Sequence, residues 1–227
     1  MLTLLTATGC RQKTWEICEK LMMNQDYVGK VRWVIVDDGE QAQDIRFNRK
    51  NWLVEIIRPS HRWKEGANTQ KKNLLAGLRI ISDQEKLVII EDDDYYASNY
   101  LSSVDNWLNE ADLVGESCSI YYNIKTQKYR QLPNMFHSSL CSTAMKGSAI
   151  HFFRSVCTSN DIFLDVLLWK KYKGSKQLYR SNMVVGIKGM AGRNGIGMGH
   201  KKDFQGKIDI DKSEFIRLIG KDAYLYG

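Results

Sequence analysis

A short apolar run that ends in four consecutive acids constrains the fold more than any other stretch. Residues 87–90 read Leu-Val-Ile-Ile, typical of a strand buried on both faces of a parallel sheet, and Glu91, Asp92, Asp93 and Asp94 follow directly. Carboxylates about 4 Å apart repel by on the order of 4 kcal/mol where the effective dielectric constant is near 20. Open α/β sheets bind ligands at this end of their strands. The acids therefore need a divalent cation, raised pKa values or plain solvent, and we expect Mg²⁺ or Mn²⁺ that holds the phosphates of a nucleotide.

Apolar strands alternate with amphipathic helices through the first half of the chain. The predicted strands are residues 2–6, 31–36, 52–57 and 87–90, and the predicted helices are residues 13–23, 71–81 and 99–111. Short apolar strands separated by helices predict an α/β fold, with an open, mostly parallel sheet and helices on both faces.

The pattern changes after residue 111. We expect an antiparallel hairpin at 112–132, a strand at 148–156 and a helix at 162–172. A strand region at 177–188 and a glycine-rich loop at 189–199 follow. Two prolines and the lack of a Ser/Gly-rich run argue against a linker. The sequence thus predicts a single domain over residues 1–227. Its parallel half, 1–111, would bind a nucleotide, and its smaller mixed half, 112–227, would face an acceptor.

Composition fits a globular chain without a membrane anchor. The 227 residues are 43% hydrophobic and 26% charged, which is enough apolar material for one good core. No apolar stretch approaches the roughly 18 residues of a membrane span, and the N-terminus lacks a basic region and a long apolar region. Five cysteines without a C-x-x-C pair are typical of reduced core thiols. We expect a cytoplasmic protein, and the sequence does not fix its oligomeric state.

The positive charge is concentrated in the last third of the chain. From Lys146 onward, 15 Lys and Arg stand against 7 Asp and Glu, a net charge of +8, whereas the first 145 residues hold 18 against 19, a net charge of −1. A basic region beside an acidic metal site favours a polyanionic partner: nucleic acid, a phosphorylated ligand or an anionic membrane surface. The alternative is a solvated basic face that only keeps the protein soluble.

Five stretches in order resemble a known enzyme family. They are Val34 to Gly39 (VIVDDG), the segment 68–77 with Asn73, the acidic run with the Asn99-Tyr100-Leu101 that follows it, the pair Asn160-Asp161 ahead of a helix, and His200 after the glycine loop. The set resembles the nucleotide-sugar glycosyltransferases of the GT-A (Rossmann-like) fold, closest to the inverting family 2, over roughly residues 1–175. The resemblance implies a metal-dependent, inverting transfer of a hexosyl or pentosyl group from a nucleoside-diphosphate sugar, most readily a UDP-sugar.

The resemblance also implies a donor site. Asp37 or Asp38 would accept hydrogen bonds from the uracil or ribose, with an Asp-Gly turn as the alternative reading. In the D-x-D motif, Asp92 and Asp94 would contact the metal and the ribose, although Glu91 and Asp93 offer a second frame. His200 would complete the metal ligands, or would be an ordinary surface histidine. The donor residues implied in total are Thr6, Ala7, Arg11, Asp37, Asp38, Asn73, Asp92, Asp93 and Arg193, with Mn²⁺ or Mg²⁺ held by Asp92, Asp94 and His200.

Asp161 is the candidate general base. The family has two acids before a helix at this point, and here Asn160 stands in place of the first. The second acid deprotonates the acceptor hydroxyl, and one carboxylate is enough for a single displacement at the anomeric carbon. Asp161 could instead only cap the helix, since Asp is a favoured capping residue. Asp165, one helical turn further on, is the alternative base.

The acceptor is the least determined part of the prediction. Compact enzymes of this kind include bacteriophage enzymes that modify DNA, so we expect an acidic acceptor, and the best candidate is a hydroxymethylated base in DNA. The base would have to be flipped out, and Phe152, Phe153 and Arg154 are candidates to receive it. Three alternatives stay open: a saccharide or lipid-linked glycan acceptor, a nucleotidyltransferase, and a non-enzymatic nucleic-acid-binding module.

Overall fold

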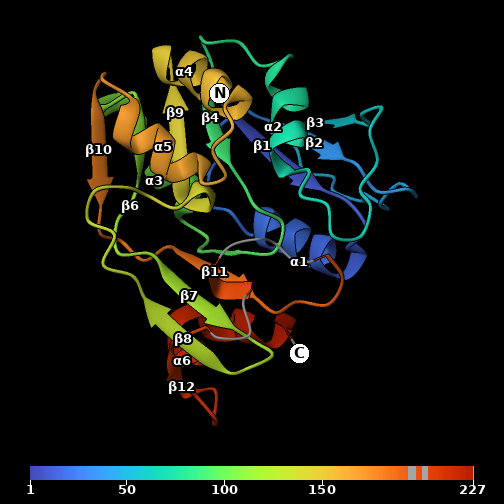
Figure 1. Cartoon of the computed structure of the whole chain (residues 1–227), viewed down its shortest axis with the longest axis vertical. Coiled ribbons are helices and arrows are strands. Elements are labelled where there is room, and N and C mark those ends of the chain that lie inside the picture. Colours follow the sequence, from blue (N-terminus) through green and yellow to red (C-terminus); the bar gives the residue numbers. More distant parts are fainter. Residues whose placement is uncertain (194–197, 201–203, 227) are drawn as a thin grey trace.

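A seven-stranded sheet forms the centre of the computed structural model, which describes residues 1–193, 198–200 and 204–226 (Figure 1). Its strand order is β10-β6-β9-β4-β1-β2-β3. In chain order these strands are β1 (Leu2–Thr8), β2 (Val31–Asp37), β3 (Trp52–Ile57), β4 (Lys86–Ile89), β6 (Leu113–Glu116), β9 (Thr143–Lys146) and β10 (Lys176–Tyr179). Strand β9 runs antiparallel to both of its neighbours, and the remaining pairs in this sheet are parallel.

Helices cover both faces of this sheet, because alternate residues of its central strands point to opposite sides. Leu4, Trp33 and Val88 belong to a core shared with α1 (Gln12–Met23) and α3 (Tyr100–Glu110). The other face packs against α2 (Gln70–Leu78), α4 (Ser148–Thr158) and α5 (Leu164–Lys171). The expected α/β architecture, a mostly parallel sheet flanked by helices, is confirmed.

A second sheet of five strands, order β12-β8-β7-β11-β5, lies below the first in Figure 1. Its strands are β5 (Tyr95–Tyr96), β7 (Ile120–Asn123), β8 (Lys128–Gln131), β11 (Val184–Lys188) and β12 (Lys207–Ile208). Strands β7 and β8 form the antiparallel hairpin predicted within 112–132. The region 177–188, predicted as one strand, is divided between β10 in the large sheet and β11 in the small one. Helix α6 (Ser213–Ile219) and short 3-10 helices at Leu140–Ser142, Met198–His200 and Gly220–Tyr226 complete the described elements.

The strand predicted at 148–156 is wrong, because this segment forms the helix α4. Ala149, Ile150, Phe153 and Val156 recur at helical spacing and are buried on one face. Phe153 is therefore in the core, and Arg154 pairs with Asp83 instead of facing a ligand. The predicted use of Phe152, Phe153 and Arg154 to receive a flipped base is wrong for the same reason.

Glu116 connects the two sheets. Its carboxylate ends β6, is buried, and accepts hydrogen bonds from the backbone N–H groups of Met183 (2.8 Å) and Val184 (3.1 Å) and from the Ser181 hydroxyl. Burial raises the pKa of this carboxyl. Because β11 starts at Val184, Glu116 fixes where the small sheet leaves the large one. Strands from both sides of residue 111 share the large sheet, and among the described residues no helix has the length and apolar character needed to cross a membrane.

Candidate active site

A cavity of about 1030 Å³ lies at the C-terminal ends of β1 and β4. Its lining residues come from the segments that follow β1, β3 and β4, from the small sheet and from the start of α5. The C-terminal ends of parallel strands are where open α/β sheets bind ligands, because the loops there diverge and leave a crevice. The position and size of this cavity are those of a binding site for a large polar ligand.

Arg11 neutralises two of the four acids. It lies between β1 and α1, and its Nη1 is 3.0 Å from Asp92 Oδ1 while its Nη2 is 2.9 Å from Asp93 Oδ2. The second oxygen of Asp92 accepts a hydrogen bond of 2.5 Å from the Thr8 hydroxyl. Asp92 and Asp93 both line the cavity. One guanidinium thus bridges two neighbouring carboxylates at the cavity floor.

Asp94 points away from the cavity, unlike Asp93. Its Oδ1 accepts hydrogen bonds from the backbone N–H of Ile187 (2.8 Å) and from Lys188 Nζ (2.9 Å), both on β11. Their side chains are almost fully buried, with 0% of Asp94 and 6% of Lys188 exposed. Asp94, expected as a metal ligand, is therefore paired with a lysine beneath the site. Of the two sequence frames, Glu91 and Asp93 are the pair that lines the cavity.

The pKa shifts follow from burial and these pairings. Burial raises the pKa of Asp92 to about 6, against the opposing effect of Arg11. Burial also favours a raised pKa for Asp93, but Arg11, with smaller contributions from Lys188 and His200, holds it below its usual range. Burial, followed by the charge of Asp94, raises the pKa of Glu91 well above its ordinary value. Two cations thus compensate the acidic run: Arg11 pairs with Asp92 and Asp93, and Lys188 pairs with Asp94.

His200 faces the same cavity from the segment after β11. Burial lowers its pKa to about 4, which keeps the imidazole neutral at pH 7. Its Nδ1 is buried and has no hydrogen-bond partner among the described residues. A neutral imidazole and the nearby Asp93 carboxylate form a donor set suited to Mn²⁺ or Mg²⁺. A second group, Glu91, Asp94 and Cys141, has ligand atoms within 4.8 Å, but Lys188 already occupies Asp94. Residues 194–197 of the predicted glycine loop lie outside the described residues.

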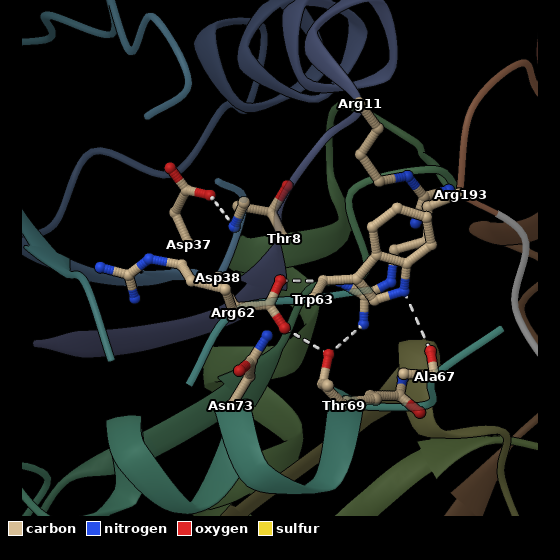
Figure 2. Close-up of polar contacts among 12 residues, drawn as sticks. Thr8, Arg11, Asp37, Asp38, Arg62, Trp63, Ala67, Thr69, Asn73 and Arg193 are labelled. Atoms are coloured by element: carbon tan, nitrogen blue, oxygen red, sulfur yellow. Dashed lines mark hydrogen bonds and ion pairs between the residues drawn. The ribbon is translucent and has the colours of Figure 1, made fainter. Parts of the chain in front are cut away.

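The two aspartates after β2 differ in their surroundings. Asp37 accepts the backbone N–H groups of Gly39 and Gln43, each at 2.9 Å, and pairs with Arg58, which is the arrangement of an Asp-Gly turn. Asp38 instead lies under Arg193, whose Nη1 is 2.8 Å from Asp38 Oδ1 (Figure 2). Arg193, expected near a diphosphate, thus meets the side chain expected to bind the nucleobase.

Other predicted donor residues lie at different depths. Ala7 lines the cavity. Thr6 lies below it and accepts a hydrogen bond of 3.0 Å from Trp33 Nε1, and Asn73 is buried on α2 with its Oδ1 2.7 Å from His61 Nε2. Neither Thr6 nor Asn73 is among the lining residues, so both support the walls without facing the cavity.

The two candidate bases are clearly separated by exposure. Asp161 is exposed, and its backbone carbonyl accepts a hydrogen bond from Lys71 Nζ at 3.1 Å; its side chain is not part of the cavity lining. Asp165, in the first turn of α5, lines the cavity, and burial raises its pKa. His137 also lines the cavity and is close enough to influence Asp165. The structure thus brings Asp165, but not Asp161, to the cavity.

Sequence reasoning missed two residues of this site. Trp63 lies in the loop after β3, lines the cavity and stacks with Arg193. In the sequence, Trp63 is a single tryptophan in a polar loop, and no periodic pattern or motif predicts a role for it. Lys188 had a clearer signal, because a lysine ends the apolar strand VVGIK. A buried lysine requires an anionic partner, and the acidic run is the obvious source.

Comparison with known proteins supports the fold. No protein-family model and no curated protein matches the sequence. Among solved structures, the chain resembles S. aureus TarS with a TM-score of 0.56 at 12% identity, covering 82% of this chain and 37% of that one. It also resembles TarS 1-349 (0.55, 13%) and TarS 1-349 in complex with UDP (0.55, 9%), each covering 82% of this chain and 60% of that one. The chain therefore spans 37% of the TarS chain and 60% of the 1-349 fragment, and shares with them the open α/β fold.

We predict that Lys188→Met destabilises the protein. It leaves the Asp94 carboxylate buried without its cation, which costs roughly 3–5 kcal/mol in free energy of unfolding. Urea denaturation measures the effect. The exposed Lys125 provides a control, since Lys125→Met should stay within about 0.5 kcal/mol of wild type. Adding Asp94→Asn to Lys188→Met should recover part of the loss. Wild-type stability of the single variant would contradict the pairing.

Proposed function

We propose that this protein is a glycosyltransferase that moves a sugar from a nucleoside-diphosphate sugar, most readily a UDP-sugar, to an acceptor hydroxyl. The observation that carries the proposal is the cavity at the ends of β1 and β4, with Arg11, Asp92 and Asp93 on its floor. The fold shared with TarS, which has been solved with UDP bound, supports the same function. In this proposal the nucleobase lies toward Asp38 and the diphosphate toward Arg11.

A divalent metal fits one part of this cavity. Asp93 and His200 would hold Mn²⁺ or Mg²⁺, since both line the cavity and His200 Nδ1 has no hydrogen-bond partner among the described residues. A metal bound there would supply charge neutralisation to the departing diphosphate. Asp92 is engaged at both oxygens by Thr8 and Arg11, and Asp94 is paired with Lys188, so neither is part of this revised ligand set.

Asp165 is the proposed general base. It lines the same cavity as Arg11, and a raised pKa makes a carboxylate a better proton acceptor. As the acceptor oxygen bonds to the anomeric carbon, its proton passes to Asp165, and the bond from that carbon to the diphosphate oxygen breaks. This single displacement inverts the anomeric configuration. Asp161 remains the alternative base, which requires the segment before α5 to turn inward.

The acceptor is proposed to be a hydroxymethylated base in DNA. The cavity lining next to Asp165 carries apolar side chains that stay exposed, with 60% of Phe163 and 66% of Ile162 exposed. Lys170 and Lys171 follow on the same helix and are exposed. An exposed aromatic ring beside cations suits a planar base attached to phosphates. A lipid-linked saccharide would also place an apolar group and a phosphate here, and is the second candidate.

Donor binding can be tested by a thermal-shift panel of nucleotide sugars with and without Mn²⁺. A ligand at about 100 times its dissociation constant stabilises by roughly 2.7 kcal/mol, a shift of a few degrees for a chain of this size. We expect a metal-dependent shift with a UDP-sugar that His200→Ala and Asp93→Asn abolish. The exposed His151 provides the control variant His151→Ala. A shift with nucleoside triphosphates only would indicate a nucleotidyltransferase, and a shift with DNA only would indicate a binding module.

Turnover should separate the two candidate bases. We predict that Asp165→Asn lowers kcat by about 10²–10⁴-fold while UDP binding is unchanged, and that Asp161→Asn has little effect. Because burial raises the pKa of Asp165, kcat should fall as the pH drops through that raised pKa, where the base becomes protonated. Steady-state kinetics over a pH series measures both effects. Loss of turnover in Asp161→Asn alone would assign the base to Asp161.

The acceptor can be tested by transfer of a radiolabelled sugar. Hydroxymethylated DNA should be labelled, whereas unmodified DNA of the same sequence should not. Phe163→Ala should raise KM for DNA about tenfold by loss of stacking, with Ile210→Ala as a control, since Ile210 is exposed but is not part of the cavity lining. Labelling of a lipid-linked saccharide in vesicles, without labelling of DNA, would select the second candidate.

A further inference from the structure

Arg193 connects three separate segments at one end of the cavity. From the segment after β11, its Nη1 reaches Asp38 Oδ1 at 2.8 Å and its Nη2 reaches Thr69 Oγ1 at 2.7 Å. Its guanidinium carbon lies 5.5 Å from the centre of the Trp63 ring. Figure 2 shows the Trp63 ring beside this guanidinium, with Asp38 to the left and Thr69 below. The guanidinium is therefore stacked on one face and hydrogen-bonded at its edge.

The Trp63 ring is held in place before any ligand arrives. Its backbone N–H donates to the Asp38 carbonyl at 2.8 Å, and its indole Nε1 donates to the Ala67 carbonyl at 2.9 Å. The ring is half-buried and lines the cavity. Because its only polar group is already bonded, Trp63 offers a ligand nothing but a flat aromatic surface.

Asp38 lies behind Arg193 and is not part of the cavity lining, so its carboxylate becomes available as an acceptor only when Arg193 moves away. Its side chain is fully buried; Arg193 contacts Oδ1, and the Thr69 hydroxyl donates to Oδ2. A pyrimidine such as uracil is a planar ring with an N–H donor at its edge, so it needs the same two things: an aromatic face and a carboxylate. Arg193 and a nucleobase cannot both stack on this face of Trp63 and bond to Asp38 Oδ1.

We propose that Arg193 takes the place of the nucleobase in the nucleotide-free protein, stacked on Trp63 and bonded to the Asp38 carboxylate that the resemblance assigns to the base. The inference rests on the proposed function, because it takes the donor to be a nucleotide. Binding of the base displaces Arg193 from Asp38 and from Trp63. Arg193 thus competes with the donor and determines how tightly the free enzyme binds it.

If Arg193 competes with the donor, removing its side chain should increase the affinity for UDP. Arg193→Ala should tighten UDP binding about tenfold, the factor that corresponds to one charge-assisted contact, as measured by isothermal titration calorimetry. Arg193→Lys keeps the charge but not the planar fork, so its affinity should fall between the two. Arg46→Ala is the matched control, since Arg46 is exposed and is not part of the cavity lining. Weaker or unchanged UDP binding by Arg193→Ala would overturn the competition.

Trp63 variants test the aromatic surface separately. Trp63→Ala should weaken binding of both uridine and UDP about tenfold, through lost base stacking, and leave binding of inorganic pyrophosphate unchanged. Trp63→Phe should retain most of the affinity. Equal loss for pyrophosphate and uridine, or no loss for uridine, would overturn stacking of the base on Trp63.

Nucleotide binding by the wild-type protein distinguishes failure of this inference from failure of the proposed function. If it binds no nucleotide in the presence of Mn²⁺, both fail. If it binds UDP but Arg193→Ala or Trp63→Ala departs from the results above, only this inference fails.

Discussion

The site depends on one electrostatic requirement: four consecutive carboxyl groups lie at the end of a central strand, and three of them, Asp92, Asp93 and Asp94, are buried. Arg11 bridges Asp92 and Asp93, Lys188 pairs with Asp94, and the pKa of Glu91 is raised. These cations come from opposite parts of the chain, one beside the first strand and one from the second sheet. Removing either would leave a charge in a poorly solvated place, which is far more costly than losing a surface ion pair. The arrangement of the two sheets is therefore tied to the charge balance of the cavity.

Much of the fold could be predicted from local pattern. Residues 31–36 and 87–90 are unbroken apolar runs, and only a strand covered on both faces suits them. Residues 148–156 misled because their aromatic and branched residues favour a strand, whereas the burial of Ala149, Ile150, Phe153 and Val156 follows a helical period. The division of 177–188 between two sheets could not be seen either, because it depends on Glu116, a partner some sixty residues away that receives the N–H groups of Met183 and Val184.

The site was predictable in position but not in detail. Acids at the end of a strand predict a ligand site there, and a cavity does lie at the ends of β1 and β4. Which acid faces the cavity depends on the turn after β4, and spacing alone could not separate Asp93 from Asp94. The same holds for Asp161 and Asp165, which differ only in how the chain enters α5. Trp63 belongs to no periodic pattern, and its contact with Arg193, 130 positions later in the sequence, cannot be read from local sequence.

The pairing of Asp94 with Lys188 also has a consequence for the order of folding. The two residues are 94 positions apart, so the chain must close a long loop before this carboxylate gains its cation. During synthesis, β1, β2 and β4 can pair early, but the acids at the end of β4 remain hydrated until residue 188 has emerged and β11 has formed. Closing the cavity floor is therefore a late event, and a partly synthesised chain keeps this edge of the sheet open to water and to chaperones.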